Sequence, residues 1–250
     1  MKGSGPNDFI NCKPNGQLHV DDEKCTIWIN DVSAAELKRI DIRESIKIGS
    51  CKVDKCLPVI PMAVNSFYIN DSLAIQEILT ENNYKLVSSS HREILTEEPC
   101  YKIDMSSPFS CYSNVSRMDE REHLIVSAMH HINQINFFNY KTGKRYSACV
   151  GEITPRHNIV DKETGLGKWV YYADLQVTEK YIYALYLNQP YNDAYEQEKK
   201  VELHVFNKEG KLQEILSLEQ YLIGISVDMS KNILYGLSYD DCIYMYNLGV

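Results

Sequence analysis

The sequence predicts an all-β protein built as a β-propeller of antiparallel four-stranded blades. Three observations favour this fold: short β-rich runs alternate with polar turns every 8 to 12 residues or so, helical periodicity is scarce, and two sequence units recur along the chain. A single meander of three or four strands cannot bury both of its faces, so its copies must stack side by side. Radial stacking gives a propeller, which leaves only short, protected edges.

The first recurring unit reads as a strand, an acidic turn and a second strand. Met118–Ala128 aligns without gaps to Val227–Leu237, and Val177–Leu185 repeats the unit with a shorter turn. An aspartate in such a turn accepts hydrogen bonds from nearby backbone amides. We therefore expect three aspartates near the strand starts to stabilise hairpin turns, namely Asp119, Asp174 and Asp228.

The second recurring unit follows the first and ends in a tight turn. Its copies are Ile135–Arg145, Leu203–Leu212 and the shorter Ile243–Gly249. In each copy an aromatic residue ends a buried strand, an asparagine takes a turn position, and a glycine supplies a positive φ. The last copy leaves its blade with an inner pair and one further strand, and in a closed propeller the outer strand would come from the N-terminus.

Weaker copies near the start raise the count to about five blades, within the usual range of four to eight. They are Lys24–Asp31 and the stretch from Phe67 to Val87. One segment, Asp31–Ile40, can be read either as a short helix with Ser33 as its N-cap or as a turn that leads into a strand.

Composition excludes several classes of partner. The formal net charge is −8, from 34 acidic and 26 basic residues, and no cluster of Lys and Arg exists to attract phosphate backbones. We therefore expect no nucleic acid partner. No apolar stretch approaches the roughly 20 residues that cross a bilayer, so no transmembrane segment is expected. The N-terminus lacks the apolar core of a signal peptide, and read literally the chain is cytoplasmic.

The eight cysteines give a weak signal for chemistry. Cys51 and Cys56 are spaced like half of a zinc site, but no second Cys or His pair follows them. We interpret the cysteines as free thiols packed like small hydrophobic residues, and we predict no metal site and no cofactor. No Gly-x-Ser-x-Gly element is present, so no catalytic residue is assigned.

Two short stretches are the candidates for ligand binding. His130 and His131 could line a channel or a pocket at the end of a blade, although neighbours on a strand point to opposite faces and could not both bind one metal. Trp169, Tyr171 and Tyr172 could form an aromatic face for a sugar or a peptide. In both stretches packing is the competing explanation. The polar segment Gln189–Lys200 is predicted to be a surface loop, the kind of segment that often carries function.

The order of several elements resembles the TolB-like six-bladed propeller proteins of anaerobic Gram-negative bacteria. The resemblance covers nearly the whole chain, and the segments that carry it are Gly3–Phe9, Ile125–Met129, Ile135–Phe138, Ala173–Thr178, Tyr181–Leu185, Val227–Asp228 and Tyr235–Leu237. It implies a single propeller domain over residues 1–250 that lacks an N-terminal blade, and a cell-envelope lipoprotein if an upstream signal is missing. The family has no assigned activity to carry over.

Two functional hypotheses follow. The first is a non-catalytic binding module whose loops and channel mouth engage an unidentified protein or carbohydrate. The alternative is a metal-dependent hydrolase or lyase that uses the central channel, which requires carboxylates or histidines to converge at one end. A third possibility is a remnant without function that exposes an unpaired strand. The fold alone does not choose among them, since propellers carry many unrelated activities.

Overall fold

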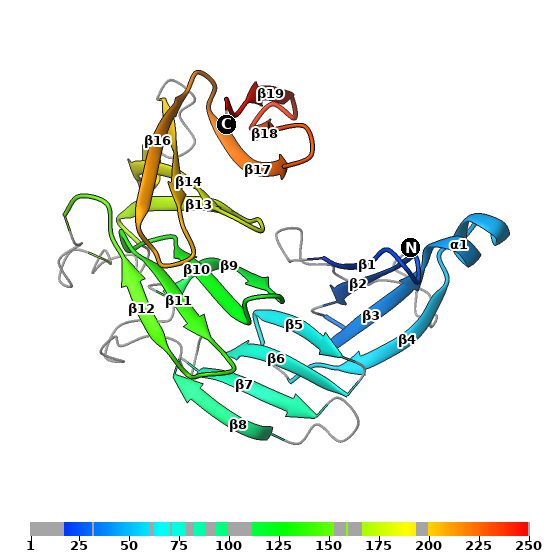
Figure 1. Cartoon of the computed structure of the whole chain (residues 1–250). Coiled ribbons are helices and arrows are strands. Elements are labelled where there is room, and N and C mark those ends of the chain that lie inside the picture. The colour runs from blue at the N-terminus through cyan, green and yellow to red at the C-terminus, as the bar shows by residue number, and fades with distance from the viewer. Residues whose placement is uncertain are drawn as a thin grey trace. The chain divides into compact units, whose positions relative to one another are not determined.

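The described residues form five antiparallel sheets and one short α-helix (Figure 1), which confirms the predicted all-β propeller fold with five blades. The computed structural model describes residues 18–31, 33–60, 63–70, 72–78, 83–88, 94–99, 112–152, 159, 167–193 and 200–249. The chain divides into two compact units, Met1–Ile103 and Asp104–Val250, and each is described by itself. The expected single domain over residues 1–250 and the sixth blade stay predictions.

The first unit contains two four-stranded blades. In both, each strand pairs antiparallel with the next one along the chain. The strands of the first blade are β1 (His19–Asp21), β2 (Thr26–Asp31), β3 (Glu36–Asp41) and β4 (Val53–Pro58). Those of the second blade are β5 (Asn65–Asn70), β6 (Leu73–Ile78), β7 (Asn83–Ser88) and β8 (Ile94–Pro99).

The core of the first unit lies between these two blades. The Trp28 ring is buried and stacks on Tyr68 with ring centroids 4.6 Å apart. Leu37 and Ile78 are buried in the same cluster. A large aromatic ring buries more apolar area than any other side chain, so Trp28 is the main hydrophobic contact between the first and second blades.

The only α-helix among the described residues is α1 (Ile42–Ile48), which follows β3 directly. The Asp41 side chain caps it by accepting the Glu44 amide at 2.8 Å, and Gly49 ends it in the left-handed region with φ +68°. The segment Asp31–Ile40 is therefore a turn that leads into strand β3, which was one of the two predicted readings. Its helical reading was wrong.

The second unit contains three blades. Two have four strands and the last has three, and the strands again pair in chain order. The first of these blades consists of β9 (Asn114–Asp119), β10 (Leu124–Met129), β11 (Ile135–Asn139) and β12 (Arg145–Ala148). The next consists of β13 (Trp169–Val177), β14 (Ile182–Pro190), β15 (Val201–Phe206) and β16 (Leu212–Leu218). The last consists of β17 (Leu222–Asp228), β18 (Ile233–Ser238) and β19 (Ile243–Asn247).

The acidic turns of the first recurring unit have the predicted geometry. Asp119 accepts the backbone amide of Arg121 at 3.1 Å, and Asp228 accepts that of Ser230 at 3.0 Å. The residue before the second strand has a positive φ in both turns, at His123 (54°) and Asn232 (53°). A side chain that satisfies the turn amides stabilises a conformation that a non-glycine residue otherwise avoids.

The tight turns of the second recurring unit are confirmed as well. Asn139 pairs its backbone amide with the Lys144 carbonyl at 2.9 Å, and Gly143 donates back to the Asn139 carbonyl at 2.8 Å with φ +71°. Asn207 and Gly210 repeat this arrangement in the next blade, where Gly210 has φ +77°. Only glycine adopts such a φ without strain, which explains why each of these turns contains a glycine after its asparagine.

The blades of the second unit pack face against face. Val126 and Phe137 of one blade meet Ile182 and Phe206 of the next in one hydrophobic cluster. Leu185 and Leu203 of that blade lie in a second cluster, which contains Leu222 and Leu234 and is packed against by Tyr244 and Tyr246 of the last blade. We call the face that packs onto the following blade the forward face. Burial of alternate residues on both faces explains why the inner strands are hydrophobic almost throughout.

Asp174 contradicts the turn interpretation. It lies inside β13, where its Oδ1 pairs with Arg117 of β9 at 3.0 Å and its Oδ2 accepts the Ile225 amide of β17 at 2.8 Å. One carboxylate thus joins the innermost strands of three consecutive blades. A buried charge needs such partners, because burial without them costs several kcal/mol. The sequence prediction failed because the partners lie 57 and 51 residues away.

The cysteines also depart from the prediction in part. Cys25 and Cys149 are half-buried free thiols, whereas Cys51, Cys56 and Cys242 are exposed free thiols. The interpretation as packed small hydrophobic residues was wrong for these three. Cys12, Cys100 and Cys111 lie outside the described residues, as does the Gly3–Phe9 element.

Candidate functional site

The loop between β10 and β11 lies against the start of β13, and this junction brings the predicted binding residues together. The His130 amide donates to the Ser113 carbonyl at 2.9 Å, which holds the loop to the start of its own blade. The Tyr171 amide donates to the His130 carbonyl at 2.7 Å, which holds β13 to the loop. Backbone hydrogen bonds on both sides therefore position the two histidines.

Both imidazoles donate to backbone carbonyls of β13. His130 Nδ1–H lies 2.6 Å from the Tyr172 carbonyl oxygen, and His131 Nδ1–H lies 2.7 Å from that of Trp169. A carbonyl oxygen only accepts, so Nδ1 carries the proton in both rings, and the lone pair of the neutral form is on Nε2. The two rings lie 6.3 Å apart. Both histidines lie in a bend after β10 rather than on a strand, so the strand geometry assumed for them does not apply.

The aromatic residues of β13 form a partly exposed row. Trp169 and Tyr171 are half-buried, and their rings stack with centroids 6.3 Å apart and an interplanar angle of 24°. Tyr171 stacks in turn on Tyr186 of β14 at 6.3 Å and 30°. On the other side of the junction the Tyr191 ring lies 6.1 Å from that of His131. We call His130, His131, Trp169, Tyr171 and Tyr191 the aromatic site.

Tyr172 belongs to the core beneath this row. Its side chain is fully buried, and its hydroxyl lies 3.4 Å from Nδ1 of His204, whose Nε2 is 3.0 Å from a Glu202 carboxylate oxygen. Burial raises the pKa of Tyr172 and lowers the pKa of His204, so both are neutral near pH 7. The Tyr186 ring stacks on that of His204 at 4.2 Å. This cluster supports the aromatic site from below.

Gly167 allows the His131 ring to reach its position. A Cβ atom at this glycine would lie 2.1 Å from Nδ1 of His131, closer than any side chain tolerates. Gly167 therefore lies where the backbone approaches a side chain closely, which is a common reason for glycine.

The structure therefore places all five predicted residues at one junction, four of them in the aromatic site and Tyr172 below it. Their role in ligand binding stays a prediction. Sequence reasoning missed the supporting residues, and the only signal for them was the period-two spacing of Glu202 and His204 along a strand. Gln189 and Pro190, which were assigned to the long surface loop, belong to β14; residues 194–199 lie outside the described part of the chain.

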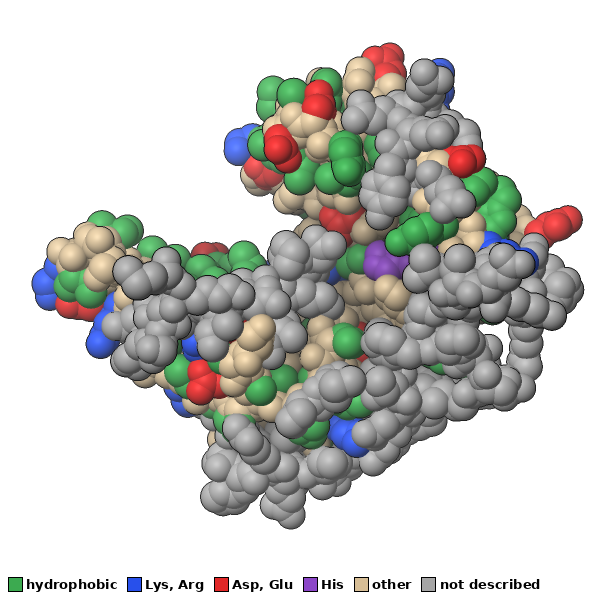
Figure 2. All heavy atoms as spheres, turned by 180° about the vertical axis from the view of Figure 1, so that it is seen from behind, with side chains coloured by type: hydrophobic (Ala, Val, Ile, Leu, Met, Phe, Trp, Pro, Cys, Tyr) green, Lys and Arg blue, Asp and Glu red, His purple; other side chains and the backbone are tan. Residues whose placement is uncertain are grey.

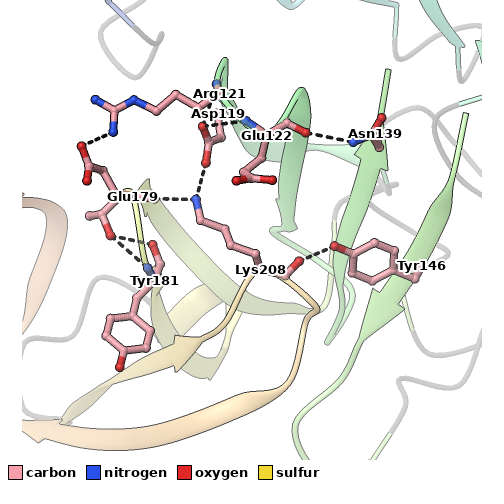
Figure 3. Close-up of polar contacts among 9 residues, drawn as sticks. Asp119, Arg121, Glu122, Asn139, Tyr146, Glu179, Tyr181 and Lys208 are labelled. Atoms are coloured by element: carbon pink, nitrogen blue, oxygen red, sulfur yellow. Dashed lines mark hydrogen bonds and ion pairs between the residues drawn. The ribbon is translucent and has the colours of Figure 1, made fainter. Parts of the chain in front are cut away.

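A second polar cluster joins the same two blades at the opposite ends of their strands (Figure 3). Lys208 lies between the Asp119 carboxylate and the Thr178 carbonyl, and its own carbonyl accepts the Tyr146 hydroxyl. Arg121 pairs with Glu179 at the surface, where both side chains are mostly exposed. An exposed ion pair contributes about 0–1 kcal/mol to the stability of the fold. Lys208 is therefore the main polar link between the two blades at this end.

A groove of about 550 Å³ lies beside this cluster. It is lined by polar side chains of both signs, and the lining residues are Glu122, Leu124, Asn139, Thr142, Lys144, Tyr146, Ser147, Lys208 and Glu209. Asn139, Ser147 and Lys208 all have partners within the protein. These residues hold the turns together, and the groove offers no group aimed at a ligand as clearly as the aromatic site does.

Within the described ranges, no group of three or more His, Cys, Asp or Glu side chains is arranged to hold a metal ion. No described helix is long and apolar enough to cross a membrane. The pair of histidines in the aromatic site is the densest set of nitrogen ligands that the junction offers.

No family model matches the chain, and no curated protein matches its sequence. Solved structures do resemble it. Hsv2 of Kluyveromyces lactis, with loop 6CD replaced by a Gly-Ser linker, has a TM-score of 0.54 at 8% identity, over 92% of this chain and 62% of that one. The extracellular domain of BT4673 from B. thetaiotaomicron has a TM-score of 0.55 at 10% identity, over 100% of this chain and 29% of that one.

A third similar structure is the Mitotic Checkpoint Complex, with a TM-score of 0.53 at 11% identity over 93% of this chain and 61% of that one. The chain thus spans less than two thirds of each of these three chains. Because identity is this low, the likeness concerns the fold alone. Together with the blade topology, it shows that this chain has the β-propeller fold.

Proposed function

We propose that this chain is a non-catalytic binding module, and that its aromatic site takes up a carbohydrate. The observation that carries the proposal is the half-exposed stack of Trp169 and Tyr171 beside two histidines of fixed tautomer. Flat aromatic faces bind the apolar faces of sugars, and nearby polar atoms orient the hydroxyl groups. Propeller scaffolds commonly serve as binding modules, which agrees with this use.

The preformed geometry supports binding without large rearrangement. Both imidazoles are anchored to β13, and Tyr171 rests on the buried Tyr186 ring. Side chains that are already ordered lose little conformational entropy when a ligand arrives. A protein loop rich in hydroxyl and apolar groups is the other class of ligand that fits this surface.

The alternative is a metal-dependent hydrolase or lyase. One observation favours it: a histidine whose Nδ1–H donates to a backbone carbonyl presents Nε2 in the form that binds metals, and both His130 and His131 have this arrangement. A catalytic zinc site usually has three protein ligands, and these two would need a third from elsewhere.

The resemblance to the TolB-like six-bladed family supports a location in the cell envelope of an anaerobic Gram-negative bacterium. We propose this location together with the carbohydrate ligand, because such envelopes and their surroundings are rich in glycans. The proposal would place the aromatic site outside the cytoplasm, where oligosaccharides are available to it.

The test is to titrate the purified chain with soluble oligosaccharides and, separately, with extended peptides. Isothermal titration calorimetry measures the binding in each titration. We expect an oligosaccharide to bind, and Tyr171→Ala to weaken that binding by about tenfold or more, as for a central aromatic contact. Tyr239→Ala, which removes an exposed tyrosine from the last blade, is the matched control and leaves affinity unchanged.

Three other results would redirect the proposal. Binding of peptides alone would assign the site to a protein partner. A rise in melting temperature with zinc or calcium that His131→Ala abolishes would favour the enzyme. Binding of a saccharide that is unaffected by Tyr171→Ala and Trp169→Ala would place the site elsewhere.

A further inference from the structure

The cluster beneath the aromatic site contains a buried histidine that the binding proposal leaves without a role. His204 of β15 is fully buried, whereas the side chain of Glu202, two residues earlier on the same strand, is 46% exposed. His204 Nε2 lies 3.0 Å from a Glu202 carboxylate oxygen, and Nδ1 lies 3.4 Å from the Tyr172 hydroxyl. A row of hydroxyl, imidazole and carboxylate thus leads from the core to the surface.

One arrangement of protons satisfies this row when the imidazole is neutral. A carboxylate only accepts hydrogen bonds, so Nε2 carries the proton and donates to Glu202. The lone pair is then on Nδ1, which accepts the O–H of Tyr172. Among the described residues, the Tyr172 hydroxyl has no second hydrogen bond. The neutral state of His204 therefore fixes the direction in which this hydroxyl points.

The surroundings of His204 hold it in the neutral state near pH 7. Burial lowers the pKa of His204, and the Glu202 carboxylate offsets part of this effect. Three further titratable groups lie close to the row, and burial raises the pKa of each, namely Tyr172 of β13, Tyr186 of β14 and Cys149, which follows β12. On β16 the residue opposite His204 is Ile215. Of the charged groups in the described part of the chain, Glu202 is the one that acts on the pKa of His204.

Two tyrosines connect His204 to the aromatic site. The hydroxyl of Tyr172 bonds to His204, and its backbone carbonyl accepts His130 Nδ1–H at 2.6 Å. The ring of Tyr186 stacks on that of His204 at 4.2 Å and on that of Tyr171 at 6.3 Å. Both tyrosines are buried in one hydrophobic cluster, against which Tyr171 packs. Contiguous contacts of this kind carry a change at one position to another.

We propose that protonation of His204 loosens the aromatic site, so that the chain holds its ligand near neutral pH and releases it in acid. This regulation rests on the proposed binding function. The half-exposed carboxylate of Glu202 gives the proton access from solvent. Figure 2 shows histidine and hydrophobic side chains next to each other at the surface, as a site open to a ligand requires.

The added proton breaks the hydrogen bond between His204 and Tyr172. It occupies Nδ1, so two donors face each other across 3.4 Å and one of them loses its acceptor. A buried donor without an acceptor is costly, which favours a shift of Tyr172. Because the carbonyl of Tyr172 anchors the His130 ring, that ring loses its position as well.

The charge of the imidazolium acts on the second tyrosine. A cation attracts the face of an aromatic ring, and the Tyr186 ring already stacks on His204 with an interplanar angle of 30°. The attraction draws Tyr186 toward His204 and away from Tyr171, which then loses part of its support. Both changes disturb the side chains of the aromatic site, so they act in the same direction.

The test is a pH titration of the full chain without ligand, followed by NMR of labelled histidine and tyrosine side chains. We expect the Tyr171 ring signals to shift with the same midpoint as the imidazole signals of His204. His204→Gln and Tyr171→Phe assign the two sets of signals. Circular dichroism defines the pH range in which the chain is folded, and only this range is used.

Glu202→Gln distinguishes His204 from the histidines of the aromatic site. It removes the charge that favours the imidazolium and keeps an oxygen that accepts Nε2–H, at a half-exposed position. We expect the midpoints of His204 and Tyr171 to move to lower pH together. Glu214→Gln, at an exposed position of β16 in the same blade, is the matched control and should leave both midpoints in place.

Calorimetry with the soluble oligosaccharides of the binding test measures the consequence for the ligand. We expect the affinity to fall by about fivefold or more across the transition, as for a typical coupling between two sites. An affinity that stays constant there would refute the regulation. If no oligosaccharide binds while Tyr171 follows His204, the binding function fails and the coupling within the chain stands.

Four further results would overturn the proposal. Tyr171 signals that stay constant while His204 titrates would show that the two are not coupled. A Tyr171 midpoint that Glu202→Gln leaves in place would assign the response to the histidines of the aromatic site. A His204 ring that stays neutral wherever the chain is folded would exclude the switch. An equal effect of Glu202→Gln and Glu214→Gln would assign the response to overall charge.

Discussion

Single residues in this protein are placed by contacts that lie far away in the sequence. Arg117 and Asp174 are the clearest example, since their buried ion pair joins β9 to β13 and Asp174 then accepts an amide of β17. Burial lowers the pKa of Arg117 and raises the pKa of Asp174, and each charge offsets part of this effect in the other. Such a pair specifies how three blades align, and it does so at the cost of desolvating both groups.

We expect Arg117→Met to destabilise the protein by about 3–5 kcal/mol, because it leaves the Asp174 carboxylate buried without its counter-charge. The pKa of Asp174 in the folded state should rise further above its unfolded value. A carboxyl group with a raised folded-state pKa contributes stability at low pH and loses it as the pH rises through that pKa. Urea unfolding should therefore show a larger loss at pH 7 than at pH 4.

The double variant Arg117→Met, Asp174→Asn is the control for this prediction. It removes both charges, so it should recover part of the lost stability and abolish the difference between the two pH values. An equal loss at both pH values in Arg117→Met would show that Asp174 does not titrate in response to Arg117.

At the scale of elements, local sequence predicts most strands and turns because their signals are local. The Asp turns at Asp119 and Asp228 were predicted from the repeat and have the expected hydrogen bonds, and so do the Asn-to-Gly turns at Asn139 and Asn207. The helix α1 was missed although Asp41 and Glu44 have the spacing of a helix N-terminus. Seven residues are too few to show a hydrophobic period, so only the cap could have revealed it.

We expect Asp41→Ala to lower the free energy of unfolding by about 1 kcal/mol, because it leaves the Glu44 amide without its side-chain acceptor. Asp41→Asn keeps an oxygen acceptor in the same place and should cost less. Chemical denaturation of both variants measures the difference, and equal losses would show that the cap contributes through charge rather than through the hydrogen bond.

At the scale of the whole molecule, the repeat gives equivalent residues different environments. Leu185 and Leu237 occupy the same repeat position on the forward faces of two blades. Leu185 is fully buried by the last blade, whereas Leu237 is 40% exposed because no described element of its own unit covers it. The repeat predicts the residue type, and only the neighbours decide how much of it is buried.

We expect Leu185→Ala to cost about 2–5 kcal/mol and Leu237→Ala to cost about 1 kcal/mol or less. The reason is that truncating a buried leucine leaves a cavity, whereas an exposed one leaves none. Thermal unfolding of both variants measures the two losses. Comparable losses would mean that Leu237 is covered by a segment of the same chain.

The sequence by itself determined the fold class, the blade repeat and the identity of the turn residues, because strand alternation and turn chemistry act over a few neighbouring residues. It also pointed to the five candidate binding residues without showing that they meet. Tertiary structure decided that His130 and His131 bind the backbone of β13, that Tyr172 is buried, and that Asp174 joins three blades. Each of these depends on contacts between blades, whose geometry no local pattern encodes.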